Sequence, residues 1–417
     1  MGTPTKIKET FTPSNLEDNY REELCNILPI LNHEGLLGLV IDYCNELKFY
    51  EKSNKESHIK TSILNKISEK LKNLRKEAIN ISKKNPSLHI KKIEEINVTG
   101  LIEAIIQITI KYYSNNITVA LSGLNINNEF MYISMNKVNE KKNLTEYILN
   151  LYNNNEKSII DKNNDFINIL KRIAEKLKFL QDECGFIHGD FHADNILIDK
   201  NDNMIFIDFE YSVIRLPTKN NNQDIILCGT KSVNLERKDI FNIKENPNLK
   251  AIDFFHLIIY INNFKNNKNT YNYLLEEIMA KIYNVCFNEK INLLNFIKYK
   301  ENPHKFTSSY NFIKQSNNLK NLYPESIINL EFNSNGTLYI EDMQPVQPPL
   351  IIYPNLLNKK KSSPKRSIEF NNNSPTKFRK ETNKLNENNR SNENNKSNKN
   401  NKSNENNNLN YNYFSRF

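Results

Sequence analysis

Glycine is scarce in this chain, with nine in 417 residues. The five cysteines lie far apart and form no Cys-x-x-Cys pair: Cys25, Cys44, Cys184, Cys228 and Cys286. That spacing excludes a disulfide framework or a cysteine zinc site and favours a reducing compartment. No run of about 18 apolar residues occurs, and the first eighteen residues lack an apolar core, so we expect neither a transmembrane helix nor a signal peptide. We therefore expect an intracellular, cytoplasmic protein with no membrane partner.

Most of the chain also lacks an excess of positive or negative charge. The formal net charge is +9, but residues 1–354 carry 43 basic and 43 acidic side chains, and the remainder carries 14 basic and 5 acidic ones. A formally neutral body gives no support for a nucleic-acid-binding surface.

Residues 355–417 are predicted to be a disordered Asn/Lys/Ser-rich basic tail. A hexapeptide repeat beginning at Ser391 ("SNENNK", "SNKNNK") cannot bury enough apolar surface to offset its ordering entropy. The first part, "KKKSSPKRSIEFNNNSPTKFRK", combines basic clusters with two Ser-Pro steps. Two interpretations stay open: a solvated tail without a specific partner, or a phosphorylation-tuned nuclear-localisation or docking segment that binds acidic partners, or nucleic acid weakly.

Hydrophobic periodicity divides the body into a mainly β first part and a mainly helical second part. Alternation over 28–53 predicts two or three strands with a hairpin turn at Asn45-Glu46, and a second hairpin is predicted over 117–138. Residues 56–84 read as a charged helix and 85–115 as a helical insertion. Apolar faces predict an amphipathic helix over 165–183 and a buried helix over 251–264.

The stretch "GFIHGDFHADNILID" at 185–199 interrupts the apolar pattern with a polar island. Asn195 follows Asp190 by five residues, and the apolar run "IFIDFEYS" delivers Asp208 thirteen residues later. Phosphoryl transfer needs an acid near the acceptor hydroxyl and two oxygen ligands for Mg²⁺ on the nucleotide phosphates. Asp190 suits the first role, and Asn195 and Asp208 suit the second. A tight loop followed by a hairpin would bring the three to one edge.

On these motifs the chain resembles the protein-kinase-like superfamily over roughly residues 25–300. The resemblance implies an α+β, two-lobed fold: an N-lobe with a small antiparallel β-sheet and a helix, and a mainly helical C-lobe. It also implies ATP and Mg²⁺ as cofactors. The implied boundaries are an N-terminal extension (1–24), the N-lobe (25–138) and the C-lobe (139–354).

Further positions follow from the same resemblance. Met135 would be the gatekeeper, and Asn136 to Val138 would form the hinge that meets adenine. "LCGT" at 227–230 looks like the segment preceding a peptide-substrate site, and Asp253 looks like the aspartate of a buried helix that braces the catalytic loop.

The nucleotide-phosphate site is predicted from a glycine pair. "HEGLLGLV" resembles a glycine-rich loop, in which Gly35, Gly38 and Val40 would contact ATP. A hairpin there would place Lys52 near the phosphates, with Lys48 as the alternative. The glutamate paired with this lysine would be Glu69, with Glu56 fitting less well.

Several residues depart from the protein-kinase pattern and favour a small-molecule substrate. Gly189 replaces the usual arginine, and His192 replaces a lysine, so that "HGDFHADN" is closer to aminoglycoside phosphotransferases. "IDFEYS" resembles choline kinases, and Glu210 would approach a second Mg²⁺. His188 and His192 complete the catalytic-loop candidates: His188 is expected to pack the loop rather than act as a base, and His192 to touch the γ-phosphate or face solvent.

The sequence therefore predicts an ATP-dependent phosphotransferase. A divergent serine/threonine protein kinase with a protein substrate is the first interpretation, because the interval from Asp208 to Asp253 has the length of an activation segment. A small-molecule kinase of the aminoglycoside or choline type and a pseudokinase scaffold are the alternatives. Asp194 is expected to cap the loop rather than take part in chemistry.

Overall fold

The computed structural model describes residues 11–33, 35–48, 54–74, 87–93, 96–126, 130–138, 142–220, 224–229, 243, 247–264, 273–286 and 319–341. The chain divides into two units, Met1–Ile351 and Ile352–Phe417, and every described residue belongs to the first. The predicted disordered tail lies outside the described residues. None of the described helices has the length and apolar character needed to cross a membrane.

The described N-terminal part is helical, which corrects the prediction of strands over 28–53. It contains η1 (Pro13–Asn15), α1 (Asp18–Ile27), η2 (Pro29–Asn32), α2 (Leu36–Lys48) and α3 (Asn54–Leu74). The buried side chains of α2 are spaced three and four residues apart, the helical period, because they include Leu36, Leu37, Val40, Ile41 and Cys44. The prediction of strands read the mixture of apolar and polar residues in this stretch as strand alternation, although the buried residues follow the helical period.

The predicted hairpin turn at Asn45-Glu46 is wrong, because Asn45 belongs to a helix. Asn45 lies inside α2, where its side chain accepts from the backbone N–H of Phe11 at 3.0 Å and donates to the carbonyl of Phe11 at 2.8 Å. The boundary after residue 24 falls inside α1, and the side chains of Leu16, Tyr20 and Leu24 are fully buried. The N-terminal residues therefore belong to the hydrophobic core.

A three-stranded antiparallel sheet follows, in the order β1-β3-β2. Its strands are β1 (Leu88–Ile93), β2 (Leu121–Ile126) and β3 (Met131–Asn136). The pairing of β2 with β3 confirms the hairpin predicted over 117–138, although its turn lies outside the described residues. Met135, the predicted gatekeeper, is a buried residue near the end of β3.

The region predicted as a helical insertion, 85–115, supplies a strand and a helix that are integral to the sheet. It contains β1 and α4 (Val98–Tyr113), which begins at Asn97, whose side chain accepts from the N–H of Thr99. Helix α4 connects β1 to β2, and its residues from Gly100 to Ile110 are all buried. A run that is apolar nearly all round belongs inside a fold and not on an added surface element.

The second part begins with β4 (Lys142–Asn143), α5 (Leu144–Asn153) and α6 (Ile159–Cys184), and α6 confirms the helix predicted over 165–183. A short sheet in the order β4-β5-β6 carries the candidate loop, with η4 (Ala193–Asn195), β5 (Ile196–Ile198) and β6 (Met204–Phe206). Next come η7 (Pro247–Ala251), the predicted buried helix α7 (Ile252–Phe264), and α8 (Tyr273–Cys286). The described part closes with η8 (Lys320–Leu322), α11 (Pro324–Ile328), β9 (Leu330–Phe332) and β10 (Leu338–Ile340).

Between β6 and η7 the chain forms a hairpin of β7 (Val213–Leu216) and β8 (Ile225–Cys228). The first half of "LCGT" is therefore the end of strand β8, and Thr230 lies outside the described residues. The hydroxyl of Tyr43 in α2 donates to the carbonyl of Cys228 at 3.4 Å, so the N-terminal helices contact this hairpin.

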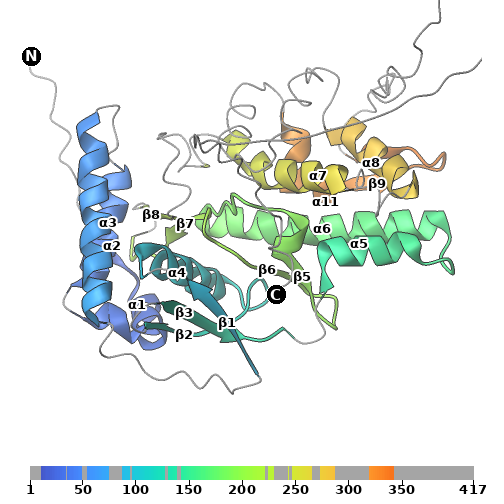
Figure 1. The fold of residues 1–417 in the computed structure, drawn as a ribbon. Coiled ribbons are helices and arrows are strands. Elements are labelled where there is room, and N and C mark those ends of the chain that lie inside the picture. Colours follow the sequence, from blue (N-terminus) through green and yellow to red (C-terminus); the bar gives the residue numbers. More distant parts are fainter. Residues whose placement is uncertain are drawn as a thin grey trace, which may run out of the picture. The chain divides into compact units, whose positions relative to one another are not determined.

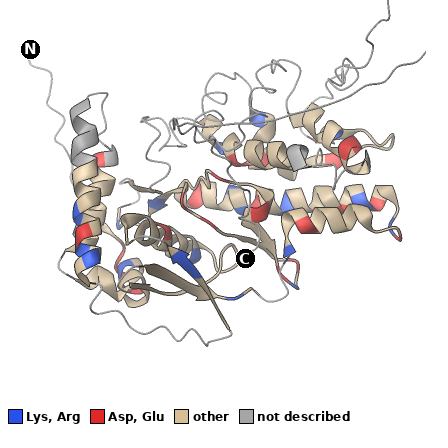
Figure 2. Ribbon diagram, in the orientation of Figure 1, with Lys and Arg blue, Asp and Glu red and all other residues tan. Residues whose placement is uncertain are grey.

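The described residues have the predicted mixed composition of small antiparallel sheets and many helices. Figure 1 shows the small sheet with α4 beside it in the first part, and the helices α5, α6, α7 and α8 in the second. Figure 2 shows basic and acidic residues interspersed along α5 and α6, in keeping with the formally neutral body.

Candidate active site

The loop after α6 is held by a carboxylate from α7. Asp253 is fully buried, and its two oxygens accept from the backbone N–H groups of His188 at 2.9 Å and Gly189 at 3.0 Å. Burial raises the pKa of Asp253 to about 7, while the two N–H donors oppose that shift. The bracing role predicted for Asp253 is confirmed.

A second constraint explains why residue 189 is glycine. Gly189 has a φ of +79°, and a Cβ at this position would lie 2.5 Å from the carbonyl oxygen of Tyr211. An arginine would therefore be strained in its backbone and would displace the chain that follows the metal-ligand candidates. The close packing of this loop therefore explains why residue 189 is glycine and not the arginine of the protein-kinase pattern.

The β5–β6 hairpin brings Asn195 and Asp208 to the same end of the short sheet. Ile196 pairs with Phe206, and the N–H of Ile207 donates to the carbonyl of Asn195 at 3.1 Å. The side-chain amide of Asn195 donates to the carbonyl of Asp190 at 2.9 Å, which ties the loop to the hairpin. Asp208 has a φ of +66°, an uncommon conformation for a residue other than glycine and one that occurs at functional sites.

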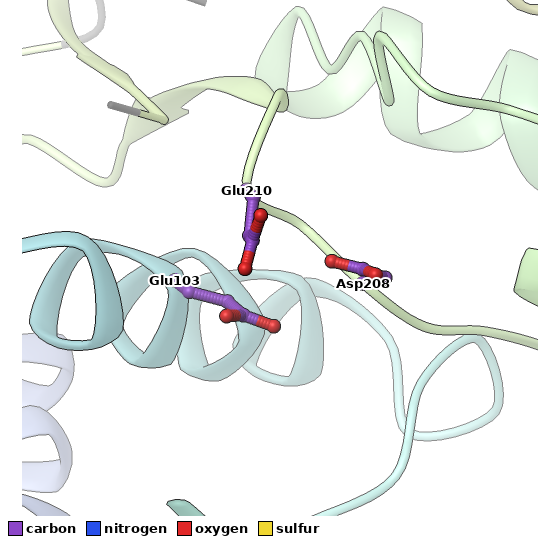
Figure 3. Close-up of side chains that lie close together, drawn as sticks. All are labelled: Glu103, Asp208 and Glu210. Carbon is purple, nitrogen blue, oxygen red and sulfur yellow. The ribbon is translucent and has the colours of Figure 1, made fainter. Parts of the chain in front are cut away.

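A lysine from β1 joins the two halves of the site. Lys91 Nζ lies 2.7 Å from Glu103 Oε1 on α4, 3.2 Å from Asp208 Oδ1 and 3.7 Å from Glu210 Oε1. Figure 3 shows the Glu103 side chain on α4 facing Asp208 and Glu210, which lie on the segment after β6. Carboxylate oxygens of the three acids lie within 4.8 Å of one another, a separation that a metal ion could bridge.

Burial and charge act in opposite directions on this group. Burial disfavours the ammonium of Lys91, but the carboxylates of Glu103, Asp208 and Glu210 outweigh it and raise the pKa of Lys91 above its usual value. Burial also raises the pKa of Glu103, and the ammonium 2.7 Å away opposes that shift. The three carboxylates therefore favour the charged form of Lys91.

The phosphate site predicted from the glycine pair is wrong. Gly38 lies within α2 and Val40 is buried there, while Gly35 directly precedes the helix, so the described residues of 33–48 form no glycine-rich loop between strands. Glu69 is an exposed residue of α3. Lys52 lies outside the described residues, as do the side chains of Lys48 and Glu56.

Sequence reasoning missed Lys91 and Glu103, although a signal was present. "LHIKKI" has strand alternation, and one acid, Glu103, stands in the otherwise apolar first half of the following helix. A lone acid in such a helix needs a hydrogen-bond donor or a cation as its partner. Lys91 meets that need from the adjacent strand.

The comparisons with known proteins agree with this geometry. The model of a family described as "Phosphotransferase enzyme family" (APH) matches residues 143–219, which include the loop, Asn195 and Asp208. Over these residues, which cover the loop and the β5–β6 hairpin, the chain is similar to that phosphotransferase family.

No curated protein matches the chain significantly. Among solved structures, the chain is similar to the LegK7 effector kinase of Legionella pneumophila at 11% identity. That match covers 65% of this chain and 71% of the other, with a TM-score of 0.26, so the two structures do not superpose closely.

The two histidines of the phosphotransferase loop differ in exposure. His188 is fully buried, its Nε2 lies 3.0 Å from the carbonyl oxygen of Ile207, and its ring packs against Phe186, Phe191 and Phe209. Burial lowers the pKa of His188 to about 4, so the ring is neutral at physiological pH. This agrees with the predicted packing role and leaves His188 unsuited to act as a base.

His192 lies beside the proposed catalytic acid. Its Nε2 is 3.7 Å from Asp190 Oδ2, and its ring stacks on Tyr260 with centroids 4.9 Å apart. The Tyr260 hydroxyl in turn donates to Asp194. Asp194 therefore shapes the loop, as predicted, and His192 lies between the Asp190 carboxylate and an aromatic ring.

The burial of His188 predicts a pH-dependent contribution to stability. Because its pKa falls from 6.5 to about 4 on folding, this contribution is present above pH 6.5 and is lost as the pH falls towards 4. A shift of this size corresponds to about 3 kcal/mol. In His188→Gln the amide can still donate to Ile207, so the stability advantage of the wild type over the variant should shrink by that amount between pH 7 and pH 4.

Urea unfolding of both proteins across this pH range measures the difference. Asp253 titrates in the same window in both proteins, so its contribution cancels. A stability difference that stays constant with pH would show that His188 protonates freely in the folded state.

Proposed function

We propose that this chain transfers the γ-phosphoryl group of ATP to an acceptor hydroxyl, with Mg²⁺ as the metal. The observation that carries the proposal is the Lys91 ammonium, which joins Glu103 on α4 to Asp208 on the segment after β6. A lysine on a strand paired with a glutamate on the neighbouring helix, close to a metal-binding aspartate, is the arrangement that phosphoryl transfer in protein kinases requires. Lys91 would bind the nucleotide phosphates, and Glu103 would orient it.

The donor set fits Mg²⁺. Asn195 and Asp208 offer an amide oxygen and a carboxylate at one end of the β5–β6 hairpin, and Glu210 adds a second carboxylate near Asp208. Hard oxygen ligands of this kind suit Mg²⁺ held partly by protein and partly by phosphate. When bound, the metal would neutralise charge on the phosphates.

Asp190 is the proposed group that orients the acceptor hydroxyl and accepts its proton. The Asp190 side chain is 36% exposed, which is more than the side chains of Glu103, Asp208 and Glu210. Its own carbonyl accepts from Asn195, so the position of the loop is set through the backbone of Asp190.

The proposed acceptor is a protein serine or threonine. The interval of 45 positions from Asp208 to Asp253 supports this, because it has the length of a protein-kinase activation segment. A small hydroxyl compound is the second candidate. It is favoured by the aromatic surface that His192 and Tyr260 form next to Asp190 and by the placement of "LC" in strand β8.

Transfer of radiolabelled γ-phosphate from ATP tests the proposal. Wild-type protein should label either a mixture of proteins or a panel of amino alcohols and aminoglycosides, and the labelled class identifies the acceptor. Asp208→Ala should reduce transfer at least about 100-fold, since one electrostatic contact to the transferring group is commonly worth that much. Equal transfer by wild type and Asp208→Ala would refute the site.

A pseudokinase is the remaining alternative. Nucleotide-dependent thermal stabilisation without label transfer to any acceptor would support a scaffold that binds ATP and does not react.

A further inference from the structure

Helix α4, which carries Glu103, is enclosed on all sides. Every residue from Gly100 to Ile110 is buried, although the small sheet can cover only one face of a helix. In kinases the lysine–glutamate pair must be in place for activity, and the position of this helix controls it. What encloses α4 on its remaining faces therefore bears on catalysis.

The N-terminal helical segment, defined here as the described residues of 11–48, contacts α4 through a buried hydrogen bond. The hydroxyls of Tyr20 and Thr109 are 2.7 Å apart, and both residues are fully buried. Thr109 already donates to the carbonyl of Ile105, so the Tyr20 hydroxyl is the donor between the two. One turn further on, Tyr112 donates to Glu17 at 2.8 Å.

The same segment also contacts the β7–β8 hairpin. The N–H of Glu17 donates to the carbonyl of Pro217 at 3.2 Å, and the N–H of Lys219 donates to the carbonyl of Asn15 at 3.0 Å. An ion pair of 2.9 Å joins Lys219 to Asp18. Figure 1 shows α1 and α2 near α4, with β7 and β8 on the same side of the molecule.

The hairpin in turn lies directly against the segment after β6 that carries Asp208 and Glu210, called the metal-ligand segment below. The N–H of Gly229 donates to the carbonyl of Ser212 at 2.7 Å. A Cβ at Gly229 would lie 2.1 Å from the carbonyl oxygen of Glu210, so only glycine allows this approach. Displacement of β8 would therefore be transmitted to the backbone of Glu210.

We propose that the N-terminal helical segment is a built-in positioning element that holds the Glu103 helix and the metal-ligand segment in register, with Tyr20 as its central positioning residue. The inference rests on the proposed function, since the pair it positions is the one that would bind ATP. It implies that α4 is held in its active position by the chain itself and needs no separate activating partner.

The experiment compares two single variants and their double variant in the full chain. Tyr20→Phe and Thr109→Val each remove the same hydrogen bond with little change in volume. Each should reduce kcat about fivefold at a temperature well below the melting transition, with KM for the acceptor unchanged. The double variant should lose no more than either single one, because both act through one contact.

Tyr152→Phe is the matched control. The Tyr152 hydroxyl donates to Asn163 at 3.0 Å between α5 and α6, away from Lys91 and Glu103. This variant should lower Tm to a similar extent as Tyr20→Phe and leave kcat within twofold of wild type. If Tyr20→Phe also lowers Tm while kcat stays within twofold, the contact only stabilises the fold and the inference is overturned.

A measurement that needs no turnover separates this inference from the proposed function. Tyr20→Phe should speed amide hydrogen exchange in residues 98–105 of α4 at least threefold relative to α6. If wild type transfers no phosphate to any acceptor but exchange changes in this way, the proposed function fails and the positioning stands. Unchanged exchange in α4 overturns the positioning whatever the activity.

Discussion

Lys91→Met should reduce phosphoryl transfer by about 100- to 1,000-fold, the usual loss when one charged contact to the reacting group is removed. Methionine retains the apolar stem, so the change is confined to the ammonium and its contacts with Glu103 and Asp208. Nucleotide affinity should fall as well, because the phosphates lose a cation. Initial rates with radiolabelled ATP and a nucleotide-dependent thermal shift measure the two effects.

The neighbouring lysine on the same strand is the matched control. Lys92 is exposed, and its Nζ lies 3.4 Å from the centre of the Phe130 ring, away from the carboxylates. Lys92→Met should keep transfer within about twofold of wild type, as expected of a surface substitution away from such features. Lys52→Met tests the position that the sequence favoured. If Lys52→Met abolishes transfer while Lys91→Met does not, the assignment of Lys91 is wrong.

Asp190→Asn should lower kcat by about 100- to 10,000-fold, the range typical of losing a general base. Nucleotide binding should be unaffected, because Asn195 bonds to the carbonyl of Asp190 and not to its carboxylate. Single-turnover rates report the chemical step, and titration of ATP by thermal shift reports binding.

Asp194→Asn is the control within the same loop. Its amide oxygen can still accept from the Tyr260 hydroxyl, so the loop should keep its shape and kcat should stay within a few-fold of wild type. A larger loss for Asp194→Asn than for Asp190→Asn would reverse the roles given to the two acids.

The catalytic loop was predictable because its chemistry is local in sequence. Asp190, Asn195 and Asp208 lie within nineteen residues, and a tight loop followed by a short hairpin brings them to one edge. The role of Asp253 was expected only from the resemblance to kinases, because the two N–H groups that it accepts from lie 65 and 64 residues away in the sequence.

The identification of the phosphate-binding lysine depends on which segment forms the sheet, and Lys52 itself lies outside the described residues. The glycine pair at Gly35 and Gly38 suggested strands, but α2 buries its apolar residues with the helical period, so those residues form no phosphate loop. Lys91 was not considered as a candidate, because it lies in residues 85–115, which were predicted to be a helical insertion. Local pattern could not distinguish the two, since both contain alternating apolar and charged residues.

By itself, the sequence was enough to predict a phosphotransferase and the residues of the candidate loop. Residues that are close in sequence along a short loop and hairpin are also close in the folded chain. Only the tertiary structure places Lys91 beside Glu103 and Asp208 and brings Tyr20 against α4. Lys91 meets Asp208 across 117 residues, and Tyr20 meets Thr109 across 89. Contacts at such separations follow from how helices and strands pack into a shared core, and no local period in the sequence records them.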